Sequence, residues 1–169
     1  IAFKLGININ KIKSALRKFL GIQRRFTKIF SIGKREFYDD YAHHPTEIKA
    51  VINSVRQVYK KRKIICVFQP HRYSRVKLLK NDFASSFISS DEVVLCPIYS
   101  AGEKIKYNIN QNNFSKLISG RSKIQVINVK NQKELNNYFN KNLTSDELVI
   151  CMGAGSISNW IREIGAKSR

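Results

Sequence analysis

The sequence has few acidic residues for its size. Its 169 residues include 12 Asp and Glu against 31 Lys and Arg, which gives a formal net charge of +19. Such an excess of positive charge favours a polyanionic partner such as nucleic acid. However, the lysines are spread along the whole chain, and no motif that reads DNA or RNA accompanies them. We therefore keep a basic nucleic-acid-binding module only as the weaker alternative.

Long hydrophobic runs and paired cysteines are also missing. No apolar run approaches the roughly 18 residues that a membrane-spanning helix needs, and no secretion leader opens the chain. We therefore expect a cytoplasmic protein without a membrane partner. The three cysteines, Cys66, Cys96 and Cys151, lie in separate apolar runs and lack the spacing of a zinc site or a disulfide framework. We expect them to be reduced core residues.

Two features of a complete nucleotide-dependent enzyme are absent as well. The chain begins with Ile1 instead of Met, and no G-x-x-x-x-G-K-S/T phosphate loop occurs in it. The glycine-rich turn "MGAGS" (152–156) is shorter than such a loop. With 43% hydrophobic residues, the chain is apolar enough to form a core, so we expect a folded fragment of a longer protein.

From residue 45 onward, short apolar runs alternate with amphipathic segments. The apolar runs predict strands buried on both faces, and the segments between them have helical spacing. The predicted strands are 63–69, 92–96, 123–129 and 148–152, and the predicted helices are 45–61, 74–89, 110–119, 132–141 and 156–164. This alternation predicts a Rossmann-like α/β fold with a mostly parallel sheet and helices on both faces.

The first 44 residues have a different pattern. Apolar residues from Ile9 to Leu20 recur at helical spacing, with Asn8 as a possible cap and Gly21 as a stop. Two short strand candidates, 27–32 and 36–40, then flank a turn at Gly33.

Polar residues follow the predicted strands. The loops read "DDYAHHP" after residue 38, "QPHRYSR" after 68, "PIYSAGE" after 96 and "MGAGS" after 151. Ligands of parallel sheets bind at the carboxyl ends of the strands, so we expect these four loops to form one site.

The "QPHRYSR" loop carries an arginine pair. Arg72 and Arg75 are three residues apart at a predicted helix start, so we expect them to project from one face and clamp a carboxylate or phosphate. His71 offers a further hydrogen bond. The alternative is a solvated basic helix start. Cations there oppose the helix dipole, which is easier to understand if an anion binds.

The "MGAGS" turn has two interpretations that the sequence leaves open. Its backbone N–H groups could approach a phosphate, or the segment is a tight strand-to-helix turn capped by Ser156.

The "DDYAHHP" loop combines acids with histidines, as metal sites do. However, His43 and His44 are adjacent and point in opposite directions in an extended segment, so a shared metal ion is not favoured. We favour a role for Asp40 or Asp39 in accepting hydrogen bonds from ribose hydroxyls, while Pro45 begins the next helix.

Five motifs in one order resemble the C-terminal part of the bacterial Mur ligases: "RRF", "DDYAHHPTEI", "FQPHRYSR", "CPIYSAGE" and "MGAGSI". The resemblance runs from about Gly21 to the end. It implies that residues 1–32 are the helical tail of a central ATPase domain with a linker, and that 33–169 are the family's C-terminal domain.

Within the family, the motifs look most like those of the members that join L-alanine to UDP-N-acetylmuramate through an acyl phosphate, in peptidoglycan synthesis. The murein tripeptide recycling ligases share "HHP" but differ across residues 69–75. The resemblance further implies ATP and Mg²⁺ as cofactors, with the magnesium ligands and the phosphate-binding lysine outside this chain. We therefore expect no complete catalytic set and no metal site here, and no activity of the chain alone.

The resemblance also assigns roles to single residues. It implies that Arg25 meets the ATP phosphates and that Asp40 holds the ATP ribose. A pocket for the amino acid and the acyl phosphate is implied for Tyr41, His43, His71, Arg72 and Arg75. Ser156 stands where many relatives carry Asp or Asn, which leaves its role open.

Overall fold

A computed structural model of the chain describes residues 1–18, 22–104 and 109–168. The strands are β1 (Thr27–Ile32), β2 (Arg35–Asp40), β3 (Ile64–Phe68), β4 (Glu92–Leu95), β5 (Gln125–Asn128) and β6 (Leu148–Met152). The helices are η1 (Phe3–Leu5), α1 (Ile9–Lys18), α2 (Pro45–Val58), α3 (Tyr73–Ala84), α4 (Gln111–Ser122), α5 (Gln132–Asn142) and α6 (Ile157–Lys167).

The six strands form one sheet in the order β1-β2-β6-β3-β4-β5. The pairs β2–β6, β6–β3, β3–β4 and β4–β5 are parallel, and only β1 runs antiparallel to its neighbour β2. The predicted α/β fold with a mostly parallel sheet is therefore confirmed. Residues 27–32, which the sequence analysis grouped with the linker, form an edge strand of this sheet.

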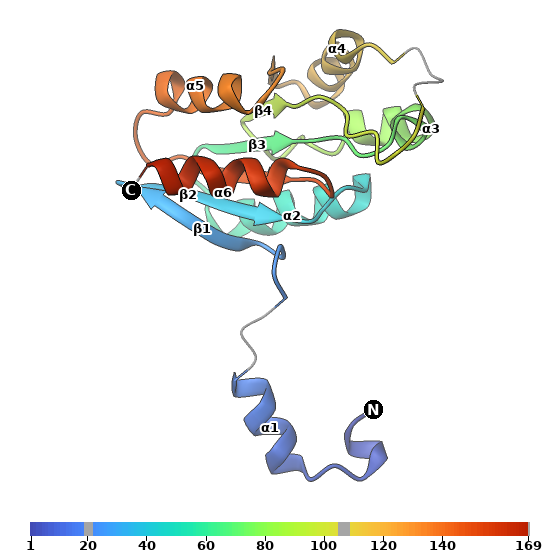
Figure 1. The fold of residues 1–169 in the computed structure, drawn as a ribbon, viewed down its shortest axis with the longest axis vertical. Coiled ribbons are helices and arrows are strands. Elements are labelled where there is room, and N and C mark those ends of the chain that lie inside the picture. The colour runs from blue at the N-terminus through green and yellow to red at the C-terminus, as the bar shows by residue number, and fades with distance from the viewer. Residues whose placement is uncertain (19–21, 105–108, 169) are drawn as a thin grey trace.

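Helices cover the sheet on both faces, and each face has its own core (Figure 1). On one face, α2, α3 and α4 pack apolar side chains such as Ile52, Phe83 and Phe114 against the strands. On the other, α5 and α6 contribute Leu135 and Ile161. Every residue of β3, β4 and β6 is buried, because these strands have helices on both sides.

Two predicted helices end earlier than expected. The first ends at Val58 instead of residue 61, and the second at Ala84 instead of residue 89. The hydroxyls of Ser85 and Ser86 donate hydrogen bonds to the carbonyl of Asp82. Such side-chain bonds compete with the helical pattern, and serine therefore tends to end helices.

The N-terminal tail lies apart from the sheet (Figure 1). Its helix α1 begins where expected, and the side chain of Asn8 accepts a hydrogen bond from the backbone N–H of Asn10 at 2.8 Å. None of its residues is buried, and Leu16 is 67% exposed. The expected apolar positions 19 and 20 and the stop at Gly21 lie outside the described residues. In the described part of the chain, no helix has the length and apolarity needed to cross a membrane.

Candidate functional site

The four loops singled out in the sequence meet at the carboxyl edge of the sheet. The strands that precede them, β2, β6, β3 and β4, are consecutive neighbours. Backbone hydrogen bonds join the loops in turn: Gly153 donates to Asp40, Gln69 to Met152, and Tyr99 to the carbonyl of Pro70. The prediction that these loops lie together at one edge is confirmed.

A row of rings crosses this edge. The rings of Tyr41 and His43 are 5.1 Å apart between centroids, and those of His43 and His71 are 5.7 Å apart. The ring of His71 stacks on Tyr99 at 5.6 Å, with 20° between the planes. The structure thus brings Tyr41, His43 and His71 together, as the sequence analysis expected. Tyr99 was not expected.

The imidazole of His71 faces a guanidinium. Nη1 of Arg75 lies 3.4 Å from Nδ1 of His71 and can only donate, so Nδ1 is the acceptor. Partial burial lowers the pKa of His71 from its usual 6.5, and the charges of Arg75, His43 and Arg72 lower it further. His71 is therefore neutral at pH 7, and its proton is on Nε2.

Arg72 and Arg75 occupy different positions at the start of α3. Arg72 lies just before α3 with φ 70°, a left-handed conformation outside the helix, while Arg75 occupies the first turn. The expected i, i+3 geometry within a helix therefore does not apply as such, but the charges of both arginines act on the imidazole of His71. Arg72 is exposed, and its backbone N–H donates to the carbonyl of Tyr99 at 2.8 Å.

The N-terminus of α3 is capped by a residue from another loop. Glu103 accepts hydrogen bonds from the backbone N–H of Ser74 at 3.2 Å and from its hydroxyl. The hydroxyl bond is the largest of the effects that lower the pKa of Glu103. The "PIYSAGE" loop has left-handed φ values of 51° at Ala101 and 83° at Gly102, directly before Glu103, where it reaches α3. Glu103 therefore holds the "PIYSAGE" and "QPHRYSR" loops together.

Asp40 is buried directly below the edge. One carboxylate oxygen accepts the backbone N–H of Phe26 at 2.8 Å, and the other accepts that of Ala42 at 2.7 Å. Burial raises the pKa of Asp40, and these two bonds partly counteract that effect. Arg25 lies close enough for its charge to act on Asp40. Arg25 is exposed and makes no hydrogen bond or ion pair with the described residues, so its donors are available to a ligand.

The second histidine of the "DDYAHHP" loop has a local structural role. His44 and Glu47 form a reciprocal capping box at the start of α2, where Pro45 occupies the first turn as predicted. Nδ1 of His43 instead donates to the carbonyl of Tyr41 at 2.9 Å. Among the described residues, no group of three or more His, Cys, Asp or Glu side chains is arranged to hold a metal ion.

The glycine-rich turn after β6 packs against Gln69. A side chain at Gly155 would meet Cγ of Tyr99 at 2.5 Å and Oε1 of Gln69 at 2.6 Å. Oε1 of Gln69 accepts the backbone N–H of Ile157 at 3.0 Å, which occupies the first turn of α6. Ser156 does not cap this helix with its side chain; its hydroxyl accepts a hydrogen bond from Nε2 of Gln69 at 3.0 Å. The geometry favours a tight strand-to-helix turn.

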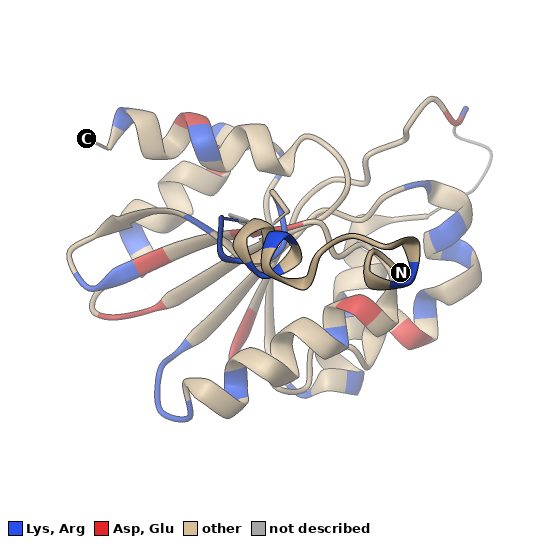
Figure 2. Cartoon of the chain, turned by 90° about the horizontal axis from the view of Figure 1, so that it is seen from below, with Lys and Arg blue, Asp and Glu red and all other residues tan. Residues whose placement is uncertain are grey.

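The positive charge is dispersed. Figure 2 shows Lys and Arg on the helices, in the loops and on the N-terminal tail alike.

The fold and the site at the carboxyl edge of the sheet define the class of protein. It is a Rossmann-like α/β domain in which guanidinium and imidazole groups gather where the parallel strands end, and such groups suit anionic ligands. The chain belongs to the Mur ligase family, since the family model "Mur ligase, glutamate ligase domain" matches residues 24–155.

Curated relatives agree with this assignment. The chain is 49% identical over 164 residues to UDP-N-acetylmuramate–L-alanine ligase of Pelagibacter ubique, with 97% of this chain and 35% of the relative covered. It is 38% identical to the ligase of the same name from Fusobacterium nucleatum, covering 97% of this chain and 36% of that one. The chain therefore spans about a third of the length of these relatives.

Two solved structures share the fold. The UDP-N-acetylmuramate–alanine ligase of Thermotoga maritima superimposes with a TM-score of 0.76 at 24% identity, covering 98% of this chain and 34% of that one. A murein peptide ligase from Psychrobacter arcticus gives 0.72 at 16% identity, covering 99% of this chain and 34% of that one.

Proposed function

We propose that this chain is the C-terminal part of a ligase that joins L-alanine to UDP-N-acetylmuramate in peptidoglycan synthesis, with ATP as the energy source. The observation that carries the proposal is the row of Tyr41, His43 and His71 beside Arg75 at the carboxyl edge. Its support from sequence is the similarity to relatives that bear the name of this activity. The dependence on ATP and a nucleotide-linked substrate favours the cytoplasm.

The reaction needs cations next to developing negative charge. The muramate carboxylate becomes an acyl phosphate by phosphoryl transfer from ATP. The L-alanine amine then attacks the acyl carbon, the C–O bond to phosphate breaks, and the nitrogen loses a proton. In our proposal, Arg72 and Arg75 bind the L-alanine carboxylate and stabilise charge in the tetrahedral intermediate. Neutral His71 donates from Nε2, and Tyr41 and His43 line the remaining wall.

Two residues fit contacts to ATP. Arg25 is exposed beside Asp40 and has no partner among the described residues, which suits a guanidinium that meets phosphates. The Asp40 carboxylate uses two of its roughly four acceptor positions for backbone N–H groups, which leaves capacity for ribose hydroxyls. Magnesium, when bound, would neutralise phosphate charge. The described residues offer no cluster of ligands for it, so we assign its ligands to the rest of the ligase.

The proposal makes this chain one half of a composite site. We propose that η1 and α1 are the end of the central ATPase domain, that β1 and the residues after it form the C-terminal domain, and that catalysis needs both. The exposed face of α1, including Leu16, supports this division, because amphipathic helices normally bury their apolar side. The chain contains no phosphate loop, so we expect no turnover by the chain alone.

A chimera tests the proposal. The first two thirds of the Pelagibacter ubique ligase would be joined to this chain, and phosphate release would be measured with ATP, UDP-N-acetylmuramate and L-alanine. We expect activity that requires both substrates, and none from the 169-residue chain alone. Arg75→Gln in the chimera should lower kcat/KM about 100-fold. A folded chimera that is inactive, or one that accepts murein tripeptide in place of L-alanine, would contradict the proposal.

A further inference from the structure

We propose that Arg24 is a positioning residue, which holds Tyr41 and the glycine-rich turn in place at the amino-acid pocket. This inference rests on the proposed function, because Tyr41 belongs to that pocket. Arg24 and Arg25 are adjacent in the sequence, yet only Arg24 turns into the domain. The two arginines therefore have separate roles: Arg25 is available to ATP, and Arg24 orients protein groups.

The guanidinium of Arg24 joins three parts of the carboxyl edge. It lies over the ring of Tyr41, 4.7 Å from the centroid. Its Nη2 donates a hydrogen bond to the carbonyl of Gly153, in the turn after β6. Its Nε lies 3.6 Å from the carboxylate of Asp39. One side chain thus fixes the ring of Tyr41 relative to the turn and to the sheet.

The backbone around Arg24 is held in an unfavourable conformation. Arg24 has φ 59° and Phe26 has φ 46°, both in the left-handed region that non-glycine residues rarely adopt. Three contacts secure this geometry: Tyr41 donates its N–H to the carbonyl of Arg24 at 2.7 Å, Phe26 donates to Asp40, and the ring of Phe26 stacks on Tyr38 at 4.2 Å. Strain that the surroundings maintain in this way is typical of functional positions.

The ion pair beneath Arg24 is largely removed from water. Asp39 is fully buried, and its Oδ2 accepts from the hydroxyl of Ser158 at 2.6 Å and from Arg162 at 3.2 Å. Oδ1 of Asp39 and Nε of Arg24 are buried and have no hydrogen-bond partner among the described residues. Losing Arg24 would therefore remove the contacts to Tyr41 and Gly153, while Arg162 would still balance the carboxylate.

Arg162 provides the matched control. Its guanidinium pairs with the same oxygen of Asp39 but comes from α6, and no contact joins it to Tyr41 or Gly153 in the described structure. Arg24→Gln and Arg162→Gln each remove one positive charge next to Asp39. Only the first removes the groups that orient Tyr41, so a purely structural role and a positioning role give different results.

The kinetic test uses the active chimera. We expect Arg24→Gln to raise the KM for L-alanine about tenfold, because the pocket wall loses its fixed orientation, and to leave the KM for ATP near that of the parent. Arg162→Gln should leave both constants near the parent values. Arg24→Lys should recover only part of the loss, because an ammonium lacks the fork that meets Gly153 and Asp39 together. Equal changes in the KM for L-alanine from both glutamine variants would overturn the inference.

A second measurement needs no ligase activity. Ring resonances of Tyr41 would be recorded by NMR in the 169-residue chain carrying labelled tyrosine. We expect them to shift in Arg24→Gln and to stay in place in Arg162→Gln and Arg25→Gln. Unchanged Tyr41 resonances in Arg24→Gln would refute the inference whatever the kinetics give. A shift together with an inactive parent chimera would instead contradict the proposed function and leave the orientation of Tyr41 by Arg24 supported.

Discussion

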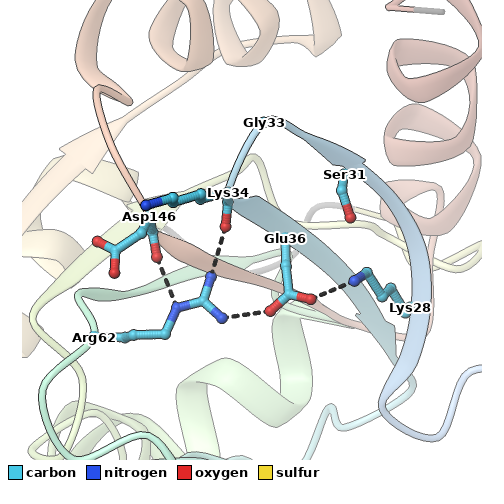
Figure 3. Close-up of a pocket in the computed structure, with 7 residues that line it drawn as sticks. All are labelled: Lys28, Ser31, Gly33, Lys34, Glu36, Arg62 and Asp146. Atoms are coloured by element: carbon cyan, nitrogen blue, oxygen red, sulfur yellow. Dashed lines mark hydrogen bonds and ion pairs between the residues drawn. The ribbon is translucent and has the colours of Figure 1, made fainter.

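The two edges of the sheet differ in how far their charged side chains are neutralised by partners within the chain. At the amino edge, Glu36 accepts from both Lys28 and Arg62, and Arg62 also donates to the carbonyls of Lys34 and Asp146 (Figure 3). These charged groups satisfy one another within the chain. At the carboxyl edge, Arg72 and Arg75 form no ion pair with the described residues. The carboxylates there already have partners: Asp39 pairs with Arg24 and Arg162, Asp40 accepts two backbone N–H groups, and Glu103 is bonded to Ser74.

The backbone conformation also differs between the two edges. Five described residues other than glycine have left-handed φ values: Arg24, Phe26, Arg72, Ala101 and Lys123. The first four lie in the loops of the carboxyl edge, and only Lys123 lies outside it, at the end of α4. Incompletely neutralised cations and backbone strain thus coincide where we place the ligands. The comparison indicates that one edge maintains the fold and the other is arranged for binding.

The amino edge should respond to mutation through stability. Arg62→Ala removes hydrogen bonds to three carbonyls and the ion pair with Glu36, so we expect the free energy of unfolding to fall by about 2 to 3 kcal/mol. The ligase activity of the folded chimera that carries Arg62→Ala should equal that of the parent chimera. Urea denaturation of the chain and initial rates of the chimera measure the two effects. A loss of activity without a loss of stability would show that this edge also contributes to function.

The same variant has a defined pH dependence. Lys28 and then Arg62 lower the pKa of Glu36 below its usual 4.5. A lowered pKa of an acid stabilises the fold above the unfolded value, and the contribution disappears as the pH falls through the folded value. Without Arg62, the pKa of Glu36 moves back toward 4.5. As the pH falls below about 5, the variant should therefore lose less stability than the parent chain. Denaturation at several pH values measures this difference.

A smaller effect is expected where the glycine-rich turn packs against the site. Gly155→Ala places a methyl group within 2.6 Å of Gln69 and Tyr99, so we expect a loss of about 1 to 2 kcal/mol together with displacement of the Tyr99 ring from His71. Gly120→Ala in α4 is the control, because its new methyl group would meet no atom within 4 Å, and should stabilise the chain by about 0.5 to 1 kcal/mol. Thermal melts distinguish the two; equal destabilisation would contradict the packing at Gly155.

Much of the fold was predictable because the central strands are buried on both faces. The apolar run at 64–68 can bury its side chains only between two layers of helices. Local signals mark where helices begin, as Pro45 does for α2. The grouping of four loops followed from the same rule, since parallel strands end at one edge.

The missed features depend on contacts between distant residues. Arg24 and Arg25 are chemically identical, and only the φ of 59° at Arg24 and the location of Asp39 decide which one turns inward. Similarly, Glu103 caps α3 from 29 residues away, a partnership that no local pattern encodes. Tyr99 lies in the loop after β4, so its position at the edge was predictable, but its stacking on His71 depends on the turn that brings the two loops together.

The smallest predicted effect concerns the protonation of His71, which reports the balance of charge at the carboxyl edge. Arg75 lowers the pKa of His71, and Glu103 raises it. Arg75→Gln should therefore raise that pKa toward 6.5, and Glu103→Gln should lower it further, as measured by NMR titration of the imidazole in the 169-residue chain. Because both variants replace a charged group with the same amide, opposite signs isolate the electrostatic effect from a change in packing. Shifts of the same sign would mean that burial, and not the neighbouring charges, controls His71, and the contrast between the two edges would then rest on backbone strain alone.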